Sequence, residues 1–185
     1  MFFKKKVNTL FLIFTIFITM IKLDSEEILF ENFIPKNKWE FISDQVMGGV
    51  SFGNYQIISD GEQNFLRLRG FVSLDNNGGF IQVRKNLTKF EHNNIKGIKI
   101  KSRGNNTHYF IHIRTKFTLL PWQYYQGKFF ASNGWKNEKI DLTNFKASGN
   151  LLPKRINPKH IKSIAIVAFG REHEVNLEVS EIRFY

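Results

Sequence analysis

The sequence predicts one all-β domain of the sandwich or barrel kind, preceded by an apolar N-terminal segment. Three observations lead to this prediction. From residue 28 onward, short runs of alternating apolar and polar residues are separated by Gly, Asn and Asp clusters at intervals of about ten residues. No segment has the spacing of a long amphipathic helix. Aromatic residues are abundant, with 20 Phe, 5 Tyr and 3 Trp, and such residues suit pleated, half-buried surfaces.

The first 25 residues have the order of an export signal. Lys4, Lys5 and Lys6 precede an apolar or hydroxyl run over residues 9–21 that ends at Lys22. This run covers about 13 residues, fewer than the roughly 20 that a permanent membrane helix needs. No small-x-small cleavage site follows it. We therefore expect an exported protein, periplasmic or extracellular, in which residues 1–25 are a signal peptide or an uncleaved membrane anchor and residues 28–185 are the β domain.

The strand predictions rest on alternation of apolar and polar residues along the chain. In Ile98–Arg103 and Tyr109–Arg114 every second residue is apolar or small, and Arg103–Asn106 between them predicts a hairpin connection. Ile164–Phe169 is apolar on both faces, which predicts a central strand. Asn150–Lys159 holds two of the four prolines and predicts an irregular loop. Further strands are predicted at Tyr55–Ser59, Phe65–Arg69, Phe80–Arg84, Tyr124–Ala131, Trp135–Asp141, Ile161–Phe169 and Val175–Tyr185, and short helical turns at Leu87–His92 or Thr143–Ala147.

The chain is basic, with 27 Lys plus Arg against 16 Asp plus Glu and a formal net charge of +11. Such a charge raises the hypothesis of a nucleic-acid or anionic-membrane partner. Part of the excess belongs to the leader, and the remaining cations are scattered without a recognition-helix pattern or an RNA-reader motif. The sequence therefore predicts a solvated basic face and does not point to nucleic acid.

No residue pattern predicts catalysis, a metal or a cofactor. The absence of cysteine excludes disulfides, thiolate metal sites and cysteine nucleophiles. His108 and His112 would lie on one face of a strand about 13 Å apart, too far to share a metal easily. The aspartates lie in or beside turns, and no serine lies in a Gly-x-Ser-x-Gly elbow. We therefore predict that the protein is not an enzyme.

Two glycine-rich strings are the most distinctive local patterns. They are DQVMGGVS over Asp44–Ser51 and DNNGGF over Asp75–Phe80. Paired glycines flanked by Asp, Asn and Ser allow positive φ and a close approach to another surface. Neither string has the Gly-Lys-Ser or Gly-Lys-Thr of a phosphate loop, and Gly79 stands where a calcium loop needs its third ligand. Two interpretations stay open: tight turns between strands, or contact loops for a partner.

The residues around both strings form a wider pattern. It consists of Trp39, Phe41 and Ser43 before the first string, Phe71, Val72, Ser73 and Leu74 before the second, Arg84, Tyr109 after Arg103-Gly104, the Gly134-Trp135 pair, Ile182 and Tyr185. Together with the strings, this pattern resembles the complex I intermediate-associated protein family over nearly all of residues 28–185. The resemblance implies a jelly-roll β-sandwich similar to galactose-binding domains. It also implies a non-catalytic assembly factor or chaperone of respiratory complex I. The family's Gly-Asp-Gly-type turn is here Gly104-Asn105-Asn106-Thr107, which lacks the carboxylate.

Two non-enzymatic functions are predicted. In the first, the strings and an exposed aromatic residue bind a protein partner, a membrane complex or its assembly intermediate. In the second, the domain is an exported carbohydrate-binding module in which Trp122, Tyr124 or Tyr125 stacks on a sugar and Asn77 or Arg84 bonds its hydroxyls; an exposed Trp122 would favour it. Trp39 and Trp135 are predicted to pack in the core. The candidate binding residues are Asp44, Met47, Gly48, Gly49, Ser51, Asn76, Asn77, Gly78, Gly79, Arg84 and Trp122.

Overall fold

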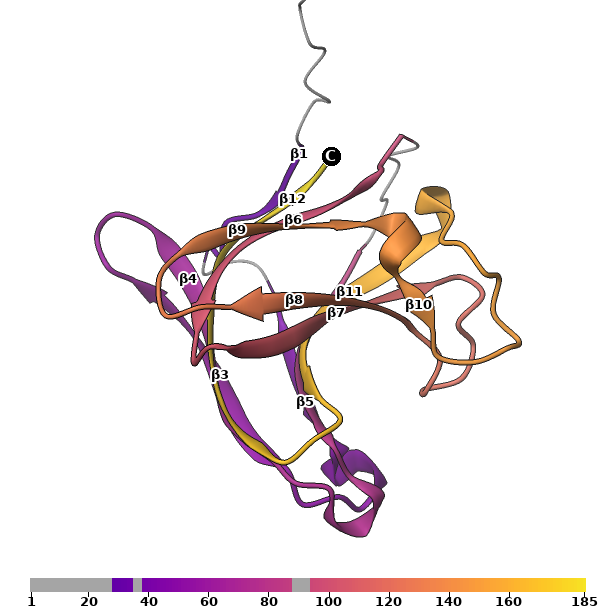
Figure 1. Cartoon of the computed structure of the whole chain (residues 1–185), viewed down its shortest axis with the longest axis horizontal. Coiled ribbons are helices and arrows are strands. Elements are labelled where there is room, and N and C mark those ends of the chain that lie inside the picture. Colours follow the sequence, from indigo (N-terminus) through magenta and orange to yellow (C-terminus); the bar gives the residue numbers. More distant parts are fainter. Residues whose placement is uncertain (1–27, 35–37, 88–93) are drawn as a thin grey trace, which may run out of the picture.

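Two six-stranded antiparallel sheets pack face to face (Figure 1). This computed structural model describes residues 28–34, 38–87 and 94–185. The all-β sandwich that the sequence predicts is confirmed. The predicted leader, residues 1–25, lies outside the described residues, and within these no helix is long and apolar enough to cross a membrane.

Most consecutive strands lie in different sheets, as in a jelly roll. Sheet A has the order β3-β4-β12-β6-β9, with β1 also paired to β12, and sheet B has the order β10-β8-β7-β11-β5-β2. The strands of sheet A are β1 (Ile28–Glu31), β3 (Phe52–Ser59), β4 (Asn64–Val72), β6 (Gly97–Gly104), β9 (Lys136–Asp141) and β12 (His173–Phe184). Those of sheet B are β2 (Glu40–Ser43), β5 (Phe80–Asn86), β7 (Thr107–Thr115), β8 (Tyr125–Ala131), β10 (Lys146–Ala147) and β11 (Ile161–Phe169). Short 3₁₀ turns are η2 (Asp44–Met47), η3 (Asp75–Asn77), η4 (Leu142–Asn144) and η5 (Pro158–His160).

Alternation along each strand builds the core between the sheets. On β4, Leu66 and Leu68 are fully buried, whereas Arg67 and Arg69 point to solvent from the other face. Burying one such aliphatic side chain stabilises the fold by roughly 1.5–3 kcal/mol. β11 lies between β7 and β5 and is buried on both faces, which confirms the central strand predicted from residues 164–169.

The hairpin predicted at Arg103–Asn106 is wrong, because β6 lies in sheet A and β7 in sheet B. The chain crosses between sheets at Gly104, where a Cβ would lie only 2.7 Å from the carbonyl oxygen of Asn176 and 3.0 Å from the Cβ of Ala131. The missing side chain lets the strand bend into the second sheet.

The other local predictions have mixed outcomes. Over Thr143–Ala147 the chain does not form one helical turn, because η4 ends at Asn144 and β10 follows at once. Most of Leu87–His92 lies outside the described residues. Asn150–Lys159 is irregular as predicted, apart from the start of η5. The sequence did not predict β1, β2 or β10, which have only two to four residues each.

Of the two tryptophans predicted to lie in the core, Trp39 is there and Trp135 is not. Trp39 is 6% exposed and stacks on Phe33 at 5.5 Å. Trp135 precedes β9 and is half-buried; its ring meets Phe65 at 5.7 Å and lies 4.6 Å from the guanidinium of Arg103. Phe65 and Arg103 both point outward from sheet A, so Trp135 covers the outer face instead of filling the core.

Candidate functional site

The two glycine-rich strings meet around one buried carboxylate. Asp44, the first residue of η2, is 0% exposed. Its Oδ1 accepts a hydrogen bond from the backbone N–H of Ser51 at 3.0 Å. Its Oδ2 accepts from the Ser51 hydroxyl, from the N–H of Gly79 at 2.6 Å and from that of Phe80 at 3.2 Å. Segments more than thirty residues apart thus form one unit, which we call the motif lobe (residues 44–51 and 73–80).

The carboxylate of Asp44 is stabilised by hydrogen bonds and not by an ion pair. Burial by itself raises its pKa, but the bonds from Ser51, Gly79 and Phe80 together outweigh burial and hold the pKa below the ordinary aspartate range. Among the described residues, none of the salt bridges involves Asp44. At neutral pH the carboxylate is therefore ionised and buried, and both of its oxygens accept hydrogen bonds from within the lobe. Asp44 and Ser51, both predicted as binding residues, are fully buried, so they shape the lobe and do not face a ligand.

The glycines are needed in the lobe for two different reasons. Gly48 and Gly79 have φ of 89° and 130°, which L side chains rarely adopt. Gly49 and Gly78 have ordinary φ, but a Cβ on either would lie within 2.5 Å of the Asp44 carboxylate. The exposed residues Asn76 and Asn77 turn the chain at φ of 55° and 56°, a region that Asn tolerates better than most residues. The tight-turn interpretation therefore describes both strings.

Replacing Gly49 by Val is expected to destabilise the protein by roughly 3 kcal/mol, because the new side chain would displace the Asp44 carboxylate from its donors. Thermal unfolding followed by circular dichroism would measure the loss. Gly134→Val is the matched control, since a Cβ at Gly134 meets nothing within 4 Å and its φ is not positive. Equal midpoints for the two variants would contradict the steric role of Gly49.

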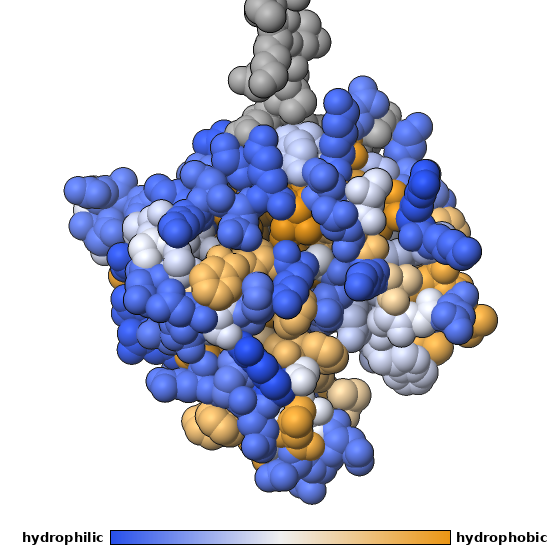
Figure 2. All heavy atoms as spheres, in the orientation of Figure 1, coloured by the Kyte–Doolittle hydropathy of each residue, from blue (hydrophilic) through white to orange (hydrophobic). Residues whose placement is uncertain are grey.

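The motif lobe displays four exposed apolar side chains, which we call the apolar tip. Val46 is 72%, Met47 58%, Val50 43% and Leu74 48% exposed. Figure 2 shows hydrophobic residues at the lower end of the molecule, where Figure 1 places the loops that follow β2 and β4. Hydrophobic side chains grouped on a surface in this way indicate an interaction site.

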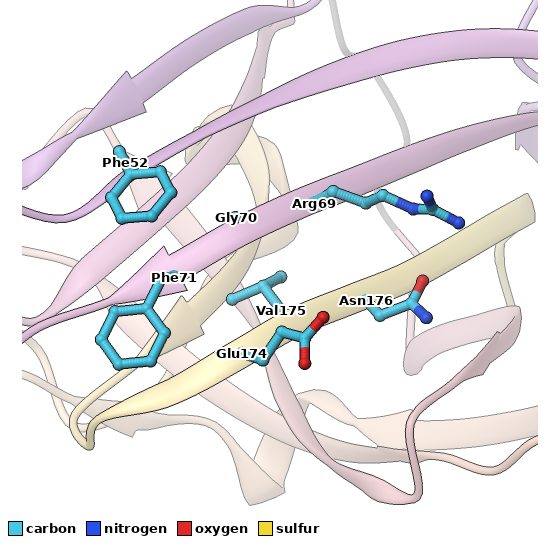
Figure 3. Close-up of a pocket in the computed structure, with 7 residues that line it drawn as sticks. All are labelled: Phe52, Arg69, Gly70, Phe71, Glu174, Val175 and Asn176. Carbon is cyan, nitrogen blue, oxygen red and sulfur yellow. The ribbon is translucent and has the colours of Figure 1, made fainter.

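A hollow of about 560 Å³ adjoins the lobe on the outer face of sheet A (Figure 3). Phe52 follows the first string directly, and Phe71 shortly precedes the second. The two residues face each other across β3 and β4, with ring centroids 6.3 Å apart. The hollow is lined by Phe52, Arg69, Gly70, Phe71, Glu174, Val175 and Asn176. From the sequence, Arg69 and Val175 are predicted only as strand ends and Phe71 belongs only to the family pattern, because the hollow depends on pairings between distant strands.

The remaining predicted residues lie on sheet B. Arg84 points outward from β5, and its Nη2 donates to Glu40 Oε2 at 2.9 Å. Trp122 lies in the loop between β7 and β8 and is 63% exposed. Since β5 and β7 both pair antiparallel with β11, Trp122 and Asn77 lie at opposite ends of the sheet. The structure therefore does not bring Asn77 together with Trp122 as one sugar site.

The tyrosines beside Trp122 have different environments. Tyr125 is 1% exposed and donates through its hydroxyl to Pro153 O at 2.9 Å, so the prediction that it could stack on a ligand is wrong. Tyr124 is half-buried and stacks on the ring of His112, with centroids 3.9 Å apart and planes at 8°. One face of Tyr124 is thereby occupied inside the protein.

His112 is a buried, uncharged group at neutral pH. Burial lowers its pKa to about 4, although the hydrogen bond between Nε2 and Gln126 Oε1 at 3.0 Å acts in the opposite direction. Within the described part of the chain, no three His, Cys, Asp or Glu side chains are grouped as metal ligands would be. His112 therefore belongs to an aromatic cluster with Tyr124 and Phe169.

The sandwich has the jelly-roll fold of the galactose-binding-like class. The family model of complex I intermediate-associated protein 30 (CIA30) matches residues 28–179, and the chain belongs to this family. The resemblance seen in the two glycine strings is confirmed. No curated protein matches the chain.

Several solved structures with a similar fold are carbohydrate-binding modules. The family 11 module of the cellulosomal cellulase Lic26A-Cel5E of Clostridium thermocellum has a TM-score of 0.71 at 14% identity, covering 86% of this chain and 94% of that one. A family 11 module from the same organism, in complex with a β-1,3-1,4-mixed-linked tetrasaccharide, has a TM-score of 0.68 at 14% identity over 85% and 94% of the chains. A family 30 module has a TM-score of 0.56 at 12% identity over 87% and 88%. At these identities the similarity shows the fold alone, and it confirms the jelly-roll prediction.

Proposed function

We propose that the protein is a non-catalytic module that binds a protein partner through the apolar tip of the motif lobe. The partner is a membrane complex related to respiratory complex I, or an intermediate in its assembly, as the family name suggests. The observation that carries the proposal is the pairing of a clamped backbone with exposed apolar side chains: Asp44 holds the lobe from inside, while Met47 and its neighbours face solvent.

The hydrogen bonds of Asp44 to both strings make the apolar tip suitable for binding. A loop that is already ordered loses little conformational entropy when a partner docks, so more of the contact energy contributes to affinity. Asp44 fixes both strings at once, and Gly48 and Gly49 each donate a backbone hydrogen bond within η2. Methionine is enriched at protein interfaces and adapts its shape to a partner surface. The tip therefore combines a fixed frame with adaptable contact groups.

The charges around the tip favour a protein over an anionic membrane surface. Adsorption to anionic lipid needs Lys or Arg beside the apolar side chains. Neither glycine string contains a cation. The turn between β11 and β12 packs on the lobe through a hydrogen bond from Gly170 N–H to Gly79 O at 2.9 Å, and it adds both Arg171 and Glu172. Asp75 is also exposed, so these loops carry no net positive charge. The absence of net positive charge does not favour anionic lipid, but it is compatible with a largely apolar protein interface.

We place the module outside the cytoplasm, exported or tethered to the membrane by residues 1–25. The order of cationic and apolar residues in that segment supports this placement. The partner surface would then be one that a membrane complex exposes on the same side.

Site-specific photo-cross-linking tests the proposed docking surface. A photoreactive phenylalanine derivative at Met47 of the full-length protein is expected to cross-link to a discrete protein in membranes of the native cells, and mass spectrometry should identify a subunit of a membrane complex. The matched control carries the same group at Leu151, which is 88% exposed but lies in the loop after β10. Identical products from both positions, or none from Met47, would refute the tip as the docking surface.

Carbohydrate binding is the second candidate function, and the 63% exposure of Trp122 favours it. Solved modules of this fold are described as carbohydrate-binding, one of them in complex with a tetrasaccharide. If a sugar stacks on Trp122, retention of the purified protein in polysaccharide-containing gels should be lost in Trp122→Ala.

A further inference from the structure

The hollow on sheet A is built from two rows of outward-pointing side chains. Phe52, Phe71 and Glu174 form one row across β3, β4 and β12, because Phe71 pairs with both other residues. Arg69 and Asn176 are paired in the next row, two residues along, which is a separation of about 7 Å in a strand. The backbone of Gly70 and Val175 lies between the rows (Figure 3).

A glycine pair brings the two aromatic rings together. Gly53 and Gly70 are directly opposite each other, and a Cβ on Gly70 would lie 2.6 Å from the Cα of Gly53 and 2.1 Å from the carbonyl oxygen of Phe52. β3 and β4 therefore approach more closely here than side chains at these positions would allow. The rings of Phe52 and Phe71 lie within 25° of parallel and are 60% and 37% exposed. In Figure 3 both rings turn a face toward the viewer, so together they form an apolar platform.

The polar groups beside the platform have unused hydrogen-bonding capacity. Within the described chain, no group pairs with the guanidinium of Arg69, the carboxylate of Glu174 or the side-chain amide of Asn176. Arg donates, a carboxylate accepts and an amide does both. The two charges cancel, so the groups suit a neutral ligand whose hydroxyls both donate and accept.

The position of the hollow argues against a peptide or an apolar protein segment. β4 and β12 already have hydrogen-bonded neighbours on both sides. β3 is an edge strand, but a peptide paired with its free edge would extend sheet A sideways and would not lie over the hollow on its face. An apolar segment would bury Arg69 and Glu174 without partners, which is costly. A pyranose ring has an apolar C–H face for the platform and hydroxyls for the polar row, and the volume lies in the usual range of ligand sites.

We propose that this hollow is a binding site for a neutral saccharide, with Phe52 and Phe71 as the stacking platform and Arg69, Glu174 and Asn176 as the hydroxyl-binding groups. The site rests on the second candidate function, carbohydrate binding, but assigns it to sheet A instead of Trp122. It uses no side chain of the apolar tip, so protein docking can succeed or fail independently.

Affinity electrophoresis of the purified full-length protein tests the site. Gels containing mixed-linked β-glucan, xylan or agarose supply neutral polysaccharides, and alginate supplies an anionic one. We expect retention by at least one neutral polysaccharide and an affinity about tenfold weaker in Phe71→Ala, which loses half of the platform. Glu174→Gln, at an exposed position where folding is not at risk, should also weaken retention. Leu151→Ser, at a position 88% exposed in the loop after β10, is the control and should be retained like the unmodified protein. Trp122→Ala is tested in the same gels, because its effect separates a site on sheet A from one at the end of sheet B.

Three outcomes would overturn the proposal. The first is no retention by any neutral polysaccharide, which would also refute carbohydrate binding as a whole. The second is retention that Trp122→Ala abolishes while Phe71→Ala and Glu174→Gln leave it unchanged, which would place the sugar at the end of sheet B. The third is retention by alginate alone, which would show that the ligand is anionic.

Discussion

Replacing Asp44 by Asn is expected to lower the free energy of unfolding by about 3–5 kcal/mol, the range seen when a buried charge network loses one partner. The buried carboxylate accepts from two backbone N–H groups on one oxygen and from Ser51 on both oxygens. The Asn amide has the same shape, but one of its two terminal atoms is an NH₂ donor. If this group takes the place of Oδ2, it faces the N–H groups of Gly79 and Phe80; if it takes the place of Oδ1, it faces the N–H of Ser51. The thermal midpoint should fall by roughly 10 °C for a chain of this size.

Asp75→Asn is the matched control for this effect. Asp75 lies in the same lobe, is exposed, and no described residue donates to its carboxylate. Its replacement should change the midpoint by no more than about 1–2 °C, as for most surface substitutions. Equal thermal midpoints for Asp44→Asn and Asp75→Asn would mean that the turns alone hold the lobe in place. The hydrogen bonds of Asp44 would then not explain the rigidity of the proposed docking surface.

The sequence predicts well what depends on neighbouring residues. The alternation in β4, β6 and β7 and the doubly apolar run in β11 each follow from one local pattern. The same reasoning fails at Arg103–Asn106, because a short polar turn has the same sequence whether the next strand pairs with the first or crosses to the other sheet. It fails again at Trp135, which lies next to a strand pattern but covers cations on the outer face.

In the candidate site, too, the sequence reveals the local patterns but not the contacts between distant residues. Both glycine strings stand out in the sequence, but their meeting around Asp44 depends on a contact between residues 44 and 79. The exposure of Met47 and the burial of Ser51 follow from that contact and not from their residue types. The platform of Phe52 and Phe71 likewise depends on the register of β3 and β4, which is set by the strands as a whole.

His112 makes the stability of the protein depend on pH. Its pKa is about 4 in the folded protein and about 6.5 in an unfolded chain. Between these two values the imidazole is protonated in the unfolded state and neutral in the folded state, so lowering the pH favours unfolding. Stability is therefore complete above pH 6.5 and is lost progressively down to pH 4. Between pH 7.5 and 4.5 the free energy of unfolding should fall by about 2–3 kcal/mol through this group alone.

Urea unfolding at a series of pH values between 7.5 and 4.5 measures this dependence, and His112→Gln isolates the contribution of His112. Burial also lowers the pKa of His160 and His173, so both add to the slope of the unmodified protein in the same direction. The difference in slope between the two proteins belongs to His112, whatever the variant does to stability at pH 7.5. Parallel curves would mean that the imidazole is protonated in place, as it would be if Tyr124 moved aside and let water reach the ring. A reduced slope in His112→Gln would show that the folded protein keeps this imidazole neutral, as its burial against Tyr124 requires.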